Sequence, residues 1–294
     1  METIKIKKLD RIKNDLEINK SKMRCPQCHS SFCGIEGNSL ICSKSHCFDI
    51  AKKGYINLLK SNNSDIYNKG LFESRKRVYT CGIYRCLFEE ISYIVLDNMK
   101  NKSENIILDA GSGEGYLLNY LSKAEAISDR SKLMGVDISK EAIQIAAREE
   151  QNILWCVSDL SNLPVHDKKI SIILNMLSPA NYREFKRILN PQGVVIKVVP
   201  EEGYLKEIRE NLSGYIEKDF YSNKKIVDKF KENLNLIYED RIRYSVKIDH
   251  SVFMDLLKMT PLTAKIPDIK LENIMKLDID KITIDLKLLV GSIR

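Results

Sequence analysis

The chain has 294 residues, of which 44% are hydrophobic and 30% are charged, and its formal net charge is +7. This composition is typical of a folded soluble protein, and the positive charge is compatible with a polyanionic partner. No apolar run reaches the roughly eighteen residues that a membrane span needs, and the start of the chain lacks a secretory signal, so we expect a cytoplasmic protein without disulfides.

Residues 1–24 form a basic N-terminal extension with eight Lys or Arg against four Asp or Glu. A solvated, partly helical tail is the simpler interpretation of this segment. An arm that grips nucleic acid is the alternative, because clustered basic residues suit a phosphate backbone.

A cluster of cysteines marks residues 25–60 as a separate module. Five of the eight cysteines of the chain fall in this module, whereas a disulfide framework would spread them further. In a reducing compartment such a cluster is more often a metal site than a set of disulfides.

Four residues of this module have the spacing of zinc ligands. Cys25 and Cys28 can present two thiolates to one ion, and Cys42 and His46 form a second pair, with thirteen residues between Cys28 and Cys42. Rival ligands are present in the same module, and they are Cys33, Cys47 and His29. The adjacent Cys47 could replace His46, so the fourth ligand stays open. A closed shell of four protein ligands predicts a structural zinc, which would stabilise a module too small to fold on apolar burial alone.

Residues 61–104 are predicted to form a polar linker followed by one or two helices. Between residues 71 and 99 apolar residues recur at helical spacing, which predicts helices packed on the domain that follows. Arg75, Lys76 and Arg77 form a basic cluster on the first of these helices. Contact with the phosphates of RNA explains the cluster about as well as a solvated helix face does.

Residues 105–294 alternate strands and helices, which predicts one α/β domain. Near-continuous apolar strands indicate a parallel sheet covered by helices on both faces. The predicted strands are residues 106–108, 132–136, 153–157, 170–174 and 193–198, and the predicted helices are 116–121, 139–148 and 182–189. Two last strands, at residues 241–248 and 281–289, predict an antiparallel addition at the edge.

The first of these strands runs into a glycine-rich turn, Asp109-Ala-Gly111-Ser-Gly113-Glu-Gly115. Glycines allow backbone angles closed to other residues and a close approach of a cofactor to the main chain. A dinucleotide site has the spacing Gly-x-Gly-x-x-Gly and holds a pyrophosphate there. Because Asp109 would repel a pyrophosphate but attract an ammonium group, the turn predicts a site for S-adenosylmethionine.

Polar residues also follow the next three strands. Asp137 stands where a carboxylate can accept hydrogen bonds from ribose hydroxyls, and Asp159 stands where an adenine amino group would lie. Each could be a strand-end cap, but three acids at successive strand ends favour a cofactor site. Asn175 opens the loop after the fourth strand, and we expect it near the cofactor and the reacting methyl group, because ligands bind at the carboxyl ends of parallel strands.

These patterns predict a Rossmann-like α/β methyltransferase with a seven-stranded, mostly parallel sheet and a small N-terminal zinc domain. With them in place, the chain resembles the RlmA-type methyltransferases, which act on N1 of a guanine in 23S ribosomal RNA. The resemblance is carried by Cys25-Pro-Gln-Cys28, Ile41 to Leu59, Asp109 to Tyr116, Ser178-Pro179, Leu189 to Gly193 and Leu257 to Pro261.

The resemblance implies a function and site residues. It implies methylation of a 23S ribosomal RNA hairpin, with a zinc domain that helps to recognise the RNA. The implied zinc ligands are Cys25, Cys28, Cys42 and His46, and the implied cofactor contacts are Tyr84, Gly115, Tyr116, Leu117, Leu118 and Tyr204. Some family members protect their hosts from macrolide-type antibiotics.

Methylation of guanine N1 requires that the N1 proton is lost and that the base is looped out or flipped. Asp49 is a candidate for the proton acceptor if the zinc domain closes over the cleft, and a local hydrogen-bond role is its alternative. Two other functions compete: a methyltransferase of a small molecule or another RNA, and a catalytically silent RNA-binding relative. A homodimer is also considered.

Overall fold

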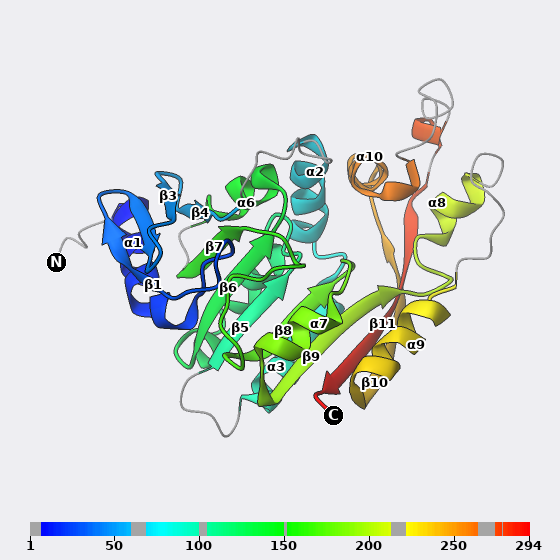
Figure 1. Cartoon of the computed structure of the whole chain (residues 1–294). Coiled ribbons are helices and arrows are strands. Elements are labelled where there is room, and N and C mark those ends of the chain that lie inside the picture. Colours follow the sequence, from blue (N-terminus) through cyan, green and yellow to red (C-terminus); the bar gives the residue numbers. More distant parts are fainter. Residues whose placement is uncertain are drawn as a thin grey trace.

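The computed structural model describes residues 7–59, 69–99, 105–149, 152–212, 222–263, 274–277 and 279–294. Within them, the strands of the predicted α/β domain are β5 (Asn105–Ala110), β6 (Ser131–Asp137), β7 (Ile153–Val157), β8 (Ile170–Met176), β9 (Leu189–Pro200), β10 (Asn235–Lys247) and β11 (Lys281–Ser292). Strands β7, β6, β5, β8 and β9 lie side by side and parallel, and β11 and β10 follow in antiparallel orientation (Figure 1). The antiparallel addition is confirmed, although the last strand in sequence lies inside the sheet and β10 forms its edge.

The cysteine module adds further strands to the same sheet. They are β1 (Phe32–Glu36), β2 (Ser39–Cys42), β3 (Cys47–Ala51) and β4 (Tyr55–Asn57), each antiparallel to the next. Strand β4 then lies parallel to β7, with Ile56 opposite Cys156 and Asn57 opposite Val157. Among the described residues the sheet therefore has eleven strands, and the prediction of seven was wrong. The pairing of β4 with β7 was not predicted, because the three residues of β4 are too few to show the alternation of apolar and polar residues that marks a strand.

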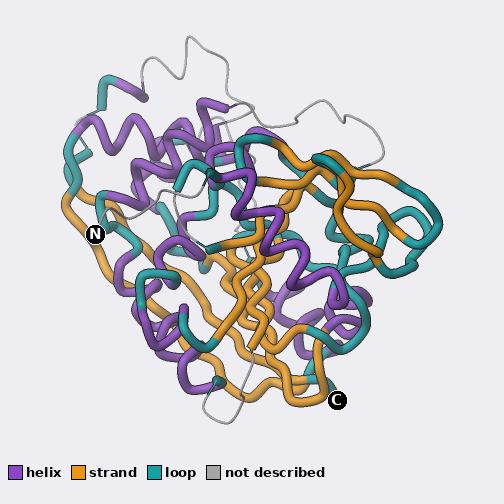
Figure 2. The backbone as a smooth tube through the Cα atoms, turned by 90° about the vertical axis from the view of Figure 1, so that its left-hand side faces the viewer, coloured by secondary structure: helices purple, strands orange, loops and turns teal. Residues whose placement is uncertain are grey.

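Helices cover both faces of this sheet. They are α1 (Lys8–Asn19), α2 (Lys69–Thr80), α3 (Arg85–Asn98), α4 (Tyr116–Leu121), α5 (Glu125–Ser128), α6 (Lys140–Ala146), α7 (Tyr182–Ile188), α8 (Lys206–Asn211), α9 (Lys224–Asn233) and α10 (His250–Met259). Apolar side chains of α1, α7 and α9 are buried in one core, and those of the other helices are buried in a second. Phe72 of α2 with Ala142 and Ile145 of α6 form a small third cluster. Figure 2 shows helices on both sides of the central strands, which confirms the predicted layers. No helix in the described ranges is long and apolar enough to cross a bilayer.

Alternate residues of the strands separate the two cores. In β7, Ile153, Trp155 and Val157 belong to the core under α2, α3 and α4, whereas Leu154 and Cys156 belong to the opposite core. Successive side chains of a strand point to opposite faces, so burial on both faces needs an unbroken apolar run. This is why β7 was recognisable in the sequence.

The N-terminal extension is not a solvated tail from Lys8 onward. Helix α1 buries Ile12 and Leu16, which are 4% and 0% exposed, in the core that also contains Met23. Leu9, Ile12 and Leu16 recur at helical spacing and form one apolar stripe among the charged residues. The stripe therefore packs this segment against the zinc module and the sheet.

Candidate cofactor and zinc sites

Four metal-binding side chains of the cysteine module converge on one point. Sγ of Cys28 lies 3.7 Å from Sγ of Cys42 and 3.2 Å from Nδ1 of His46. Nδ1 of His46 lies 3.4 Å from Sγ of Cys42 and 3.7 Å from Sγ of Cys25. A tetrahedron with zinc–sulfur distances of about 2.3 Å and zinc–nitrogen distances of about 2.0 Å has edges of about 3.5–3.8 Å. The four residues therefore fit one zinc ion.

The geometry selects His46 rather than Cys47. Cys47 and Cys33 are exposed, and neither belongs to the group of ligand atoms that lie within 4.8 Å of one another in the described part of the chain. Ser30 supports the cluster from outside: its hydroxyl lies 3.0 Å from Sγ of Cys28 and lowers the pKa of that thiol to about 6. The hydrogen bond favours the thiolate, which is the form that binds zinc.

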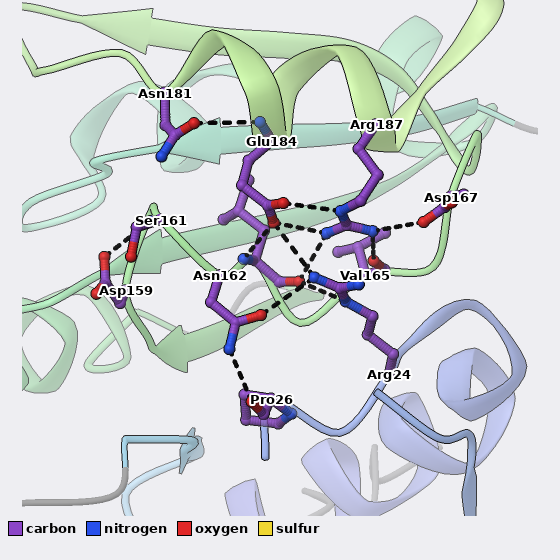
Figure 3. A network of polar contacts seen from close by, with 11 residues as sticks. Arg24, Pro26, Asp159, Ser161, Asn162, Val165, Asp167, Asn181, Glu184 and Arg187 are labelled. Carbon is purple, nitrogen blue, oxygen red and sulfur yellow. Dashed lines mark hydrogen bonds and ion pairs between the residues drawn. The ribbon is translucent and has the colours of Figure 1, made fainter. Parts of the chain in front are cut away.

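A polar network fastens the zinc module to the α/β domain (Figure 3). Arg24 donates to Oδ1 of Asn162 over 3.1 Å and to a carboxylate oxygen of Glu184 over 3.5 Å. Nδ2 of Asn162 donates to the carbonyl of Pro26, which stands between two zinc ligands, over 2.7 Å. Burial would raise the pKa of Glu184, but hydrogen bonds from Arg187 lower it below its ordinary value. The network therefore keeps a charged Glu184 beneath the metal module.

The predicted glycine turn follows β5 directly. Gly111, Gly113 and Gly115 have positive φ angles of 87°, 54° and 76°. A β-carbon at Gly111 would lie 1.9 Å from Oγ of Ser178, and one at Gly115 would lie 2.4 Å from the ring of Trp155. The turn conformation and these neighbouring side chains require glycine at both positions even before a cofactor is considered.

Three carboxylates of the described residues gather around this turn. Asp109 is 2% exposed, and its Oδ1 has no hydrogen-bond partner there. Asp137 accepts hydrogen bonds from the backbone amides of Gly113 and Ser139, each over 2.8 Å. Burial and the charges of Asp137 and Glu114 raise the pKa of Asp109 to about 8, and burial raises that of Glu114 to about 7. Buried carboxylates of this kind suit a cationic ligand.

A cation from α2 completes the cluster. Nη1 of Arg75 lies 3.7 Å from Oε2 of Glu114 and would lie 3.3 Å from a β-carbon on Gly113. The guanidinium also covers the ring of Phe72, 5.5 Å from its centre. The sequence predicts Arg75 as an RNA contact, whereas the structure places it against the glycine turn. Arg75, Asp109, Glu114 and Asp137 are called the cofactor cluster below.

Tyr84 and Tyr204, both expected at the cofactor, come together although 120 residues separate them. Their hydroxyl oxygens are 2.5 Å apart, and both side chains are buried. The ring of Tyr79 lies edge-on to Tyr84 and 5.5 Å from the ring of Tyr116. Burial raises the pKa of the Tyr79 hydroxyl, and the positive charge of Arg75 opposes this rise. The tyrosines therefore lie next to the cofactor cluster.

Three other expected contacts have different surroundings. Leu117 and Leu118 are buried in the core beneath α4, so their side chains serve packing. Asp159 is exposed after β7 and accepts a hydrogen bond from the backbone amide of Ser161 over 2.8 Å. Its carboxylate is therefore held in a local turn at the same end of the sheet as Asp137.

The side chain of Asn175 is hydrogen-bonded to the loop that follows β8 and to neighbouring strands. Nδ2 donates to the carbonyls of Ala110 and Pro179 over 2.7 and 3.1 Å, and Oδ1 accepts from Nζ of Lys197 over 2.5 Å. Burial lowers the pKa of Lys197 to about 8. Both amide hydrogens of Asn175 are already in use, so this side chain shapes the loop around Leu177, which has a φ of 49°.

Asp49, the candidate proton acceptor, lies on β3 of the zinc module. Its side chain is exposed and accepts a hydrogen bond from the hydroxyl of Ser39 on β2 over 3.1 Å. This is the local role that the sequence left as the alternative. The role of Asp49 in catalysis stays a prediction.

Two family models match separate parts of the chain. The model described as RlmA, N-terminal matches residues 23–64, and the model described as Methyltransferase domain matches residues 101–251. YxjB of Bacillus subtilis (strain 168), provisionally named a 23S rRNA (guanine-N(1)-)-methyltransferase, is 34% identical over 273 residues, which are 92% of this chain and 97% of that protein. The chain belongs to the RlmA-type 23S rRNA (guanine-N1)-methyltransferase family.

A second relative is the 23S rRNA (guanine(748)-N(1))-methyltransferase of Streptomyces fradiae. It is 26% identical over 241 residues, which are 81% of this chain and 84% of the relative. The predicted family, fold class and enzyme class are confirmed. S-adenosylmethionine and zinc are the cofactors of this RlmA-type protein, as the two family models and the Cys/His cluster indicate.

The basic cluster expected to contact RNA is engaged within the RlmA-type chain itself. Lys76 lies 2.6 Å from a carboxylate oxygen of Glu149, and Arg77 donates to both oxygens of Asp255 over 2.6 and 2.7 Å. These ion pairs join α2 to the end of α6 and to α10. A phosphate would have to compete with carboxylates that are already in place.

Proposed function

We propose that the protein transfers the methyl group of S-adenosylmethionine to N1 of a guanine in 23S ribosomal RNA. The observation that carries this proposal is the 34% identity that extends over 92% of the chain and includes both the zinc module and the methyltransferase domain. A methyltransferase domain alone would be compatible with many methyl acceptors. The match of residues 23–64 to the RlmA N-terminal model narrows the choice.

The cofactor cluster offers a partner for each charged end of the cofactor. Asp109, with its unpartnered oxygen, suits the ammonium group, and Arg75 suits the carboxylate of the methionine moiety. Asp137 has lone pairs left for the ribose hydroxyls after accepting two backbone amides. When bound, S-adenosylmethionine supplies a methyl group on a positively charged sulfur. When Asp109 and Glu114 are ionised, three carboxylates against one guanidinium favour this donor over its product, whose sulfur carries no charge.

The remaining predicted contacts complete the proposed site. The backbone from Gly111 to Leu118 would border the methionine moiety, and Asp159 would accept from the adenine amino group. Tyr84, Tyr116 and Tyr204 would close the apolar side. Asn175 contributes by holding the loop after β8 rather than by direct contact, because its amide is already bonded.

The RNA must present guanine N1, which a base pair hides, so we propose a target in a looped-out part of a 23S ribosomal RNA hairpin. The N1 proton must also be accepted, and Asp49 or a water is the proposed acceptor. One zinc held by Cys25, Cys28, Cys42 and His46 would keep the zinc module folded without taking part in the chemistry. A cytoplasmic location and a homodimer complete the proposal.

Methylation of a 23S ribosomal RNA transcript tests the function. The purified protein is incubated with the transcript and methyl-labelled S-adenosylmethionine, and the nucleosides are separated by mass spectrometry. We expect label in 1-methylguanosine at one position, which also stops reverse transcription. Label in a cell-extract metabolite instead of RNA would support the small-molecule alternative. Cofactor binding without methylation of any RNA would contradict the proposal.

A further inference from the structure

A pocket of about 430 Å³ lies between the zinc module and the methyltransferase domain. Four segments that are far apart in the sequence meet in its wall: the start of α1, the turn between β3 and β4, the start of α2, and α6 with the residues after it. None of its lining residues belongs to the cofactor cluster. The charged residues of the lining are Lys8, Lys52, Lys53, Lys69, Glu141 and Arg148. We call this the seam pocket.

Two lysines of the seam pocket are held by uncharged oxygens. Nζ of Lys8 donates to the carbonyls of Ala147 and Arg148 over 2.8 and 2.5 Å, which ties α1 to the end of α6. Nζ of Lys53 donates to Oε1 of Gln144 over 2.9 Å. An amide oxygen orients an ammonium group but does not neutralise it, so the bond to Gln144 leaves the positive charge of Lys53 in the pocket.

The other cations are only partly balanced. Arg148 lies 2.7 Å from a carboxylate oxygen of Glu73. Lys52 and Lys69 are exposed, and neither has a carboxylate within ion-pair distance among the residues that the structure describes. Glu141 is the single acidic residue among the described residues of the lining. Positive charge therefore exceeds negative charge in a concave site, in contrast to the acidic cofactor cluster nearby.

We propose that the seam pocket binds a phosphodiester group of the RNA substrate, an assignment that rests on the proposed function. Lysine ammonium groups are phosphate partners, and backbone contacts of this kind fix the position and register of a nucleic acid. No aromatic side chain is among the described residues of the lining, so these residues offer charge for a phosphate rather than a ring on which a base could stack. This favours the backbone of a polymer over a free nucleotide.

The lining of the seam pocket comes from both domains of the chain. Lys52 and Lys53 belong to the zinc module, whereas Arg148 belongs to the methyltransferase domain. A phosphate bound between them would connect the RNA to both units at once. The zinc module would then fix the register of the RNA, and so determine which guanine reaches the cofactor.

The double variant Lys52→Glu/Lys69→Glu tests the assignment, because both side chains are exposed. Binding of a 23S ribosomal RNA hairpin is measured by fluorescence anisotropy between low and physiological salt. We expect affinity to fall by about tenfold or more, and the slope of log Kd against log salt to decrease by about one. The matched control is Lys225→Glu/Lys229→Glu on α9, which makes the same charge change at exposed positions outside the pocket.

Several outcomes would overturn the assignment. Equal losses in the two double variants would mean that only net charge matters, and no loss in either would exclude a backbone contact. Competition by guanosine monophosphate or inorganic phosphate at micromolar concentration would indicate a small-ligand site instead. S-adenosylmethionine binding and zinc content, measured in every variant, must match the parent protein. Failure of the parent protein to bind any ribosomal RNA would instead remove the proposed function itself.

Discussion

The zinc module and the cofactor cluster both gather charged groups that the protein alone does not neutralise, but they are assembled differently. The four residues proposed to bind zinc lie between residues 25 and 46, and two turns are enough to bring them together. The cofactor cluster takes Arg75 from α2, Asp109 from β5, Glu114 from the glycine turn and Asp137 from β6. A site made of residues close in sequence, like the zinc module, depends on its ligand for its fold. The geometry of a site made of distant residues, like the cofactor cluster, depends on the sheet that carries them.

The comparison also leads us to expect that removing the metal and removing the cofactor have different effects on folding. The zinc module contributes few buried apolar side chains, among them Phe32, Leu40 and Phe48, and these belong to a core that it shares with the α/β domain. A module of this size needs the metal to offset its chain entropy. The cofactor cluster includes residues of β5 and β6, whose apolar side chains are buried in the two large cores on either face of the sheet.

The largest effect is expected from Cys42→Ser. Structural zinc contributes about 10 kcal/mol or more to the folding of small zinc modules, so losing one ligand should release the metal and unfold residues 25–57. Zinc per chain, measured by native mass spectrometry, should fall from one to zero, and amides of β1 to β3 should exchange rapidly. Cys33→Ser, an exposed cysteine outside the cluster, should retain the metal. Zinc retention by Cys42→Ser would show that the four ligands are misassigned.

The second largest effect is expected from Asp109→Asn, and it should fall on cofactor binding. The loss of a charge-assisted hydrogen bond of about 2–3 kcal/mol should weaken S-adenosylmethionine binding by about 30- to 150-fold. Because the pKa of Asp109 is raised to about 8, parent affinity should rise between pH 6 and pH 8 as the carboxylate ionises. The Asn variant should lack this rise. Calorimetry in two buffers would report both effects, and an unchanged pH profile would argue against an ammonium contact.

The same substitution should stabilise the cofactor-free protein. A carboxyl group whose folded pKa exceeds its unfolded value of about 3.9 contributes stability below pH 4, and this contribution is lost as pH rises toward 8. Asp109→Asn removes that loss, so it should raise the unfolding free energy at pH 8 by about 1–3 kcal/mol. Thermal unfolding at pH 5 and pH 8 would measure the difference. A lower melting temperature at pH 8 would contradict the burial argument.

Glu184→Gln should have a moderate effect on the contact between the two regions. It leaves the guanidinium groups of Arg24 and Arg187 without their shared carboxylate, at a cost of about 1–3 kcal/mol. The pKa of Glu184 is lowered, so this contribution is present at neutral pH and is lost as pH falls below about 4. Denaturant unfolding at pH 7 would measure it. Asp167→Asn, at the exposed partner of Arg187, should cost less than about 0.5 kcal/mol.

The smallest effect is expected from Lys76→Ala. Its ion pair with Glu149 is partly exposed and should contribute well under 1 kcal/mol. RNA affinity should change by less than about twofold, because the side chain already has a carboxylate partner. Fluorescence anisotropy titrations with RNA would compare the affinity of Lys76→Ala with that of Lys52→Glu/Lys69→Glu. A loss as large as in that variant would restore the RNA contact that the sequence predicts for this cluster.

The sequence predicted most of the α/β domain and the features of both sites that depend on neighbouring residues. Strand β7 matched its predicted bounds, residues 153–157, because burial on both faces leaves an unbroken apolar run. The group of Cys25, Cys28, Cys42 and His46 was recognisable because coordination of one ion restricts the spacing of its ligands, and their role as zinc ligands stays a prediction. Glu114 was overlooked, although a charged residue between two glycines of the turn was a signal that could have found it.

Contacts between distant segments were decided only by the tertiary structure. The pairing of β4 with β7, the bond between Tyr84 and Tyr204, and the place of Arg75 against Gly113 all depend on how separate elements pack. Local patterns specify which residues form a strand or a turn because neighbours share one backbone. They do not specify which face of α2 meets the sheet, because that depends on the packing of side chains far away in the sequence.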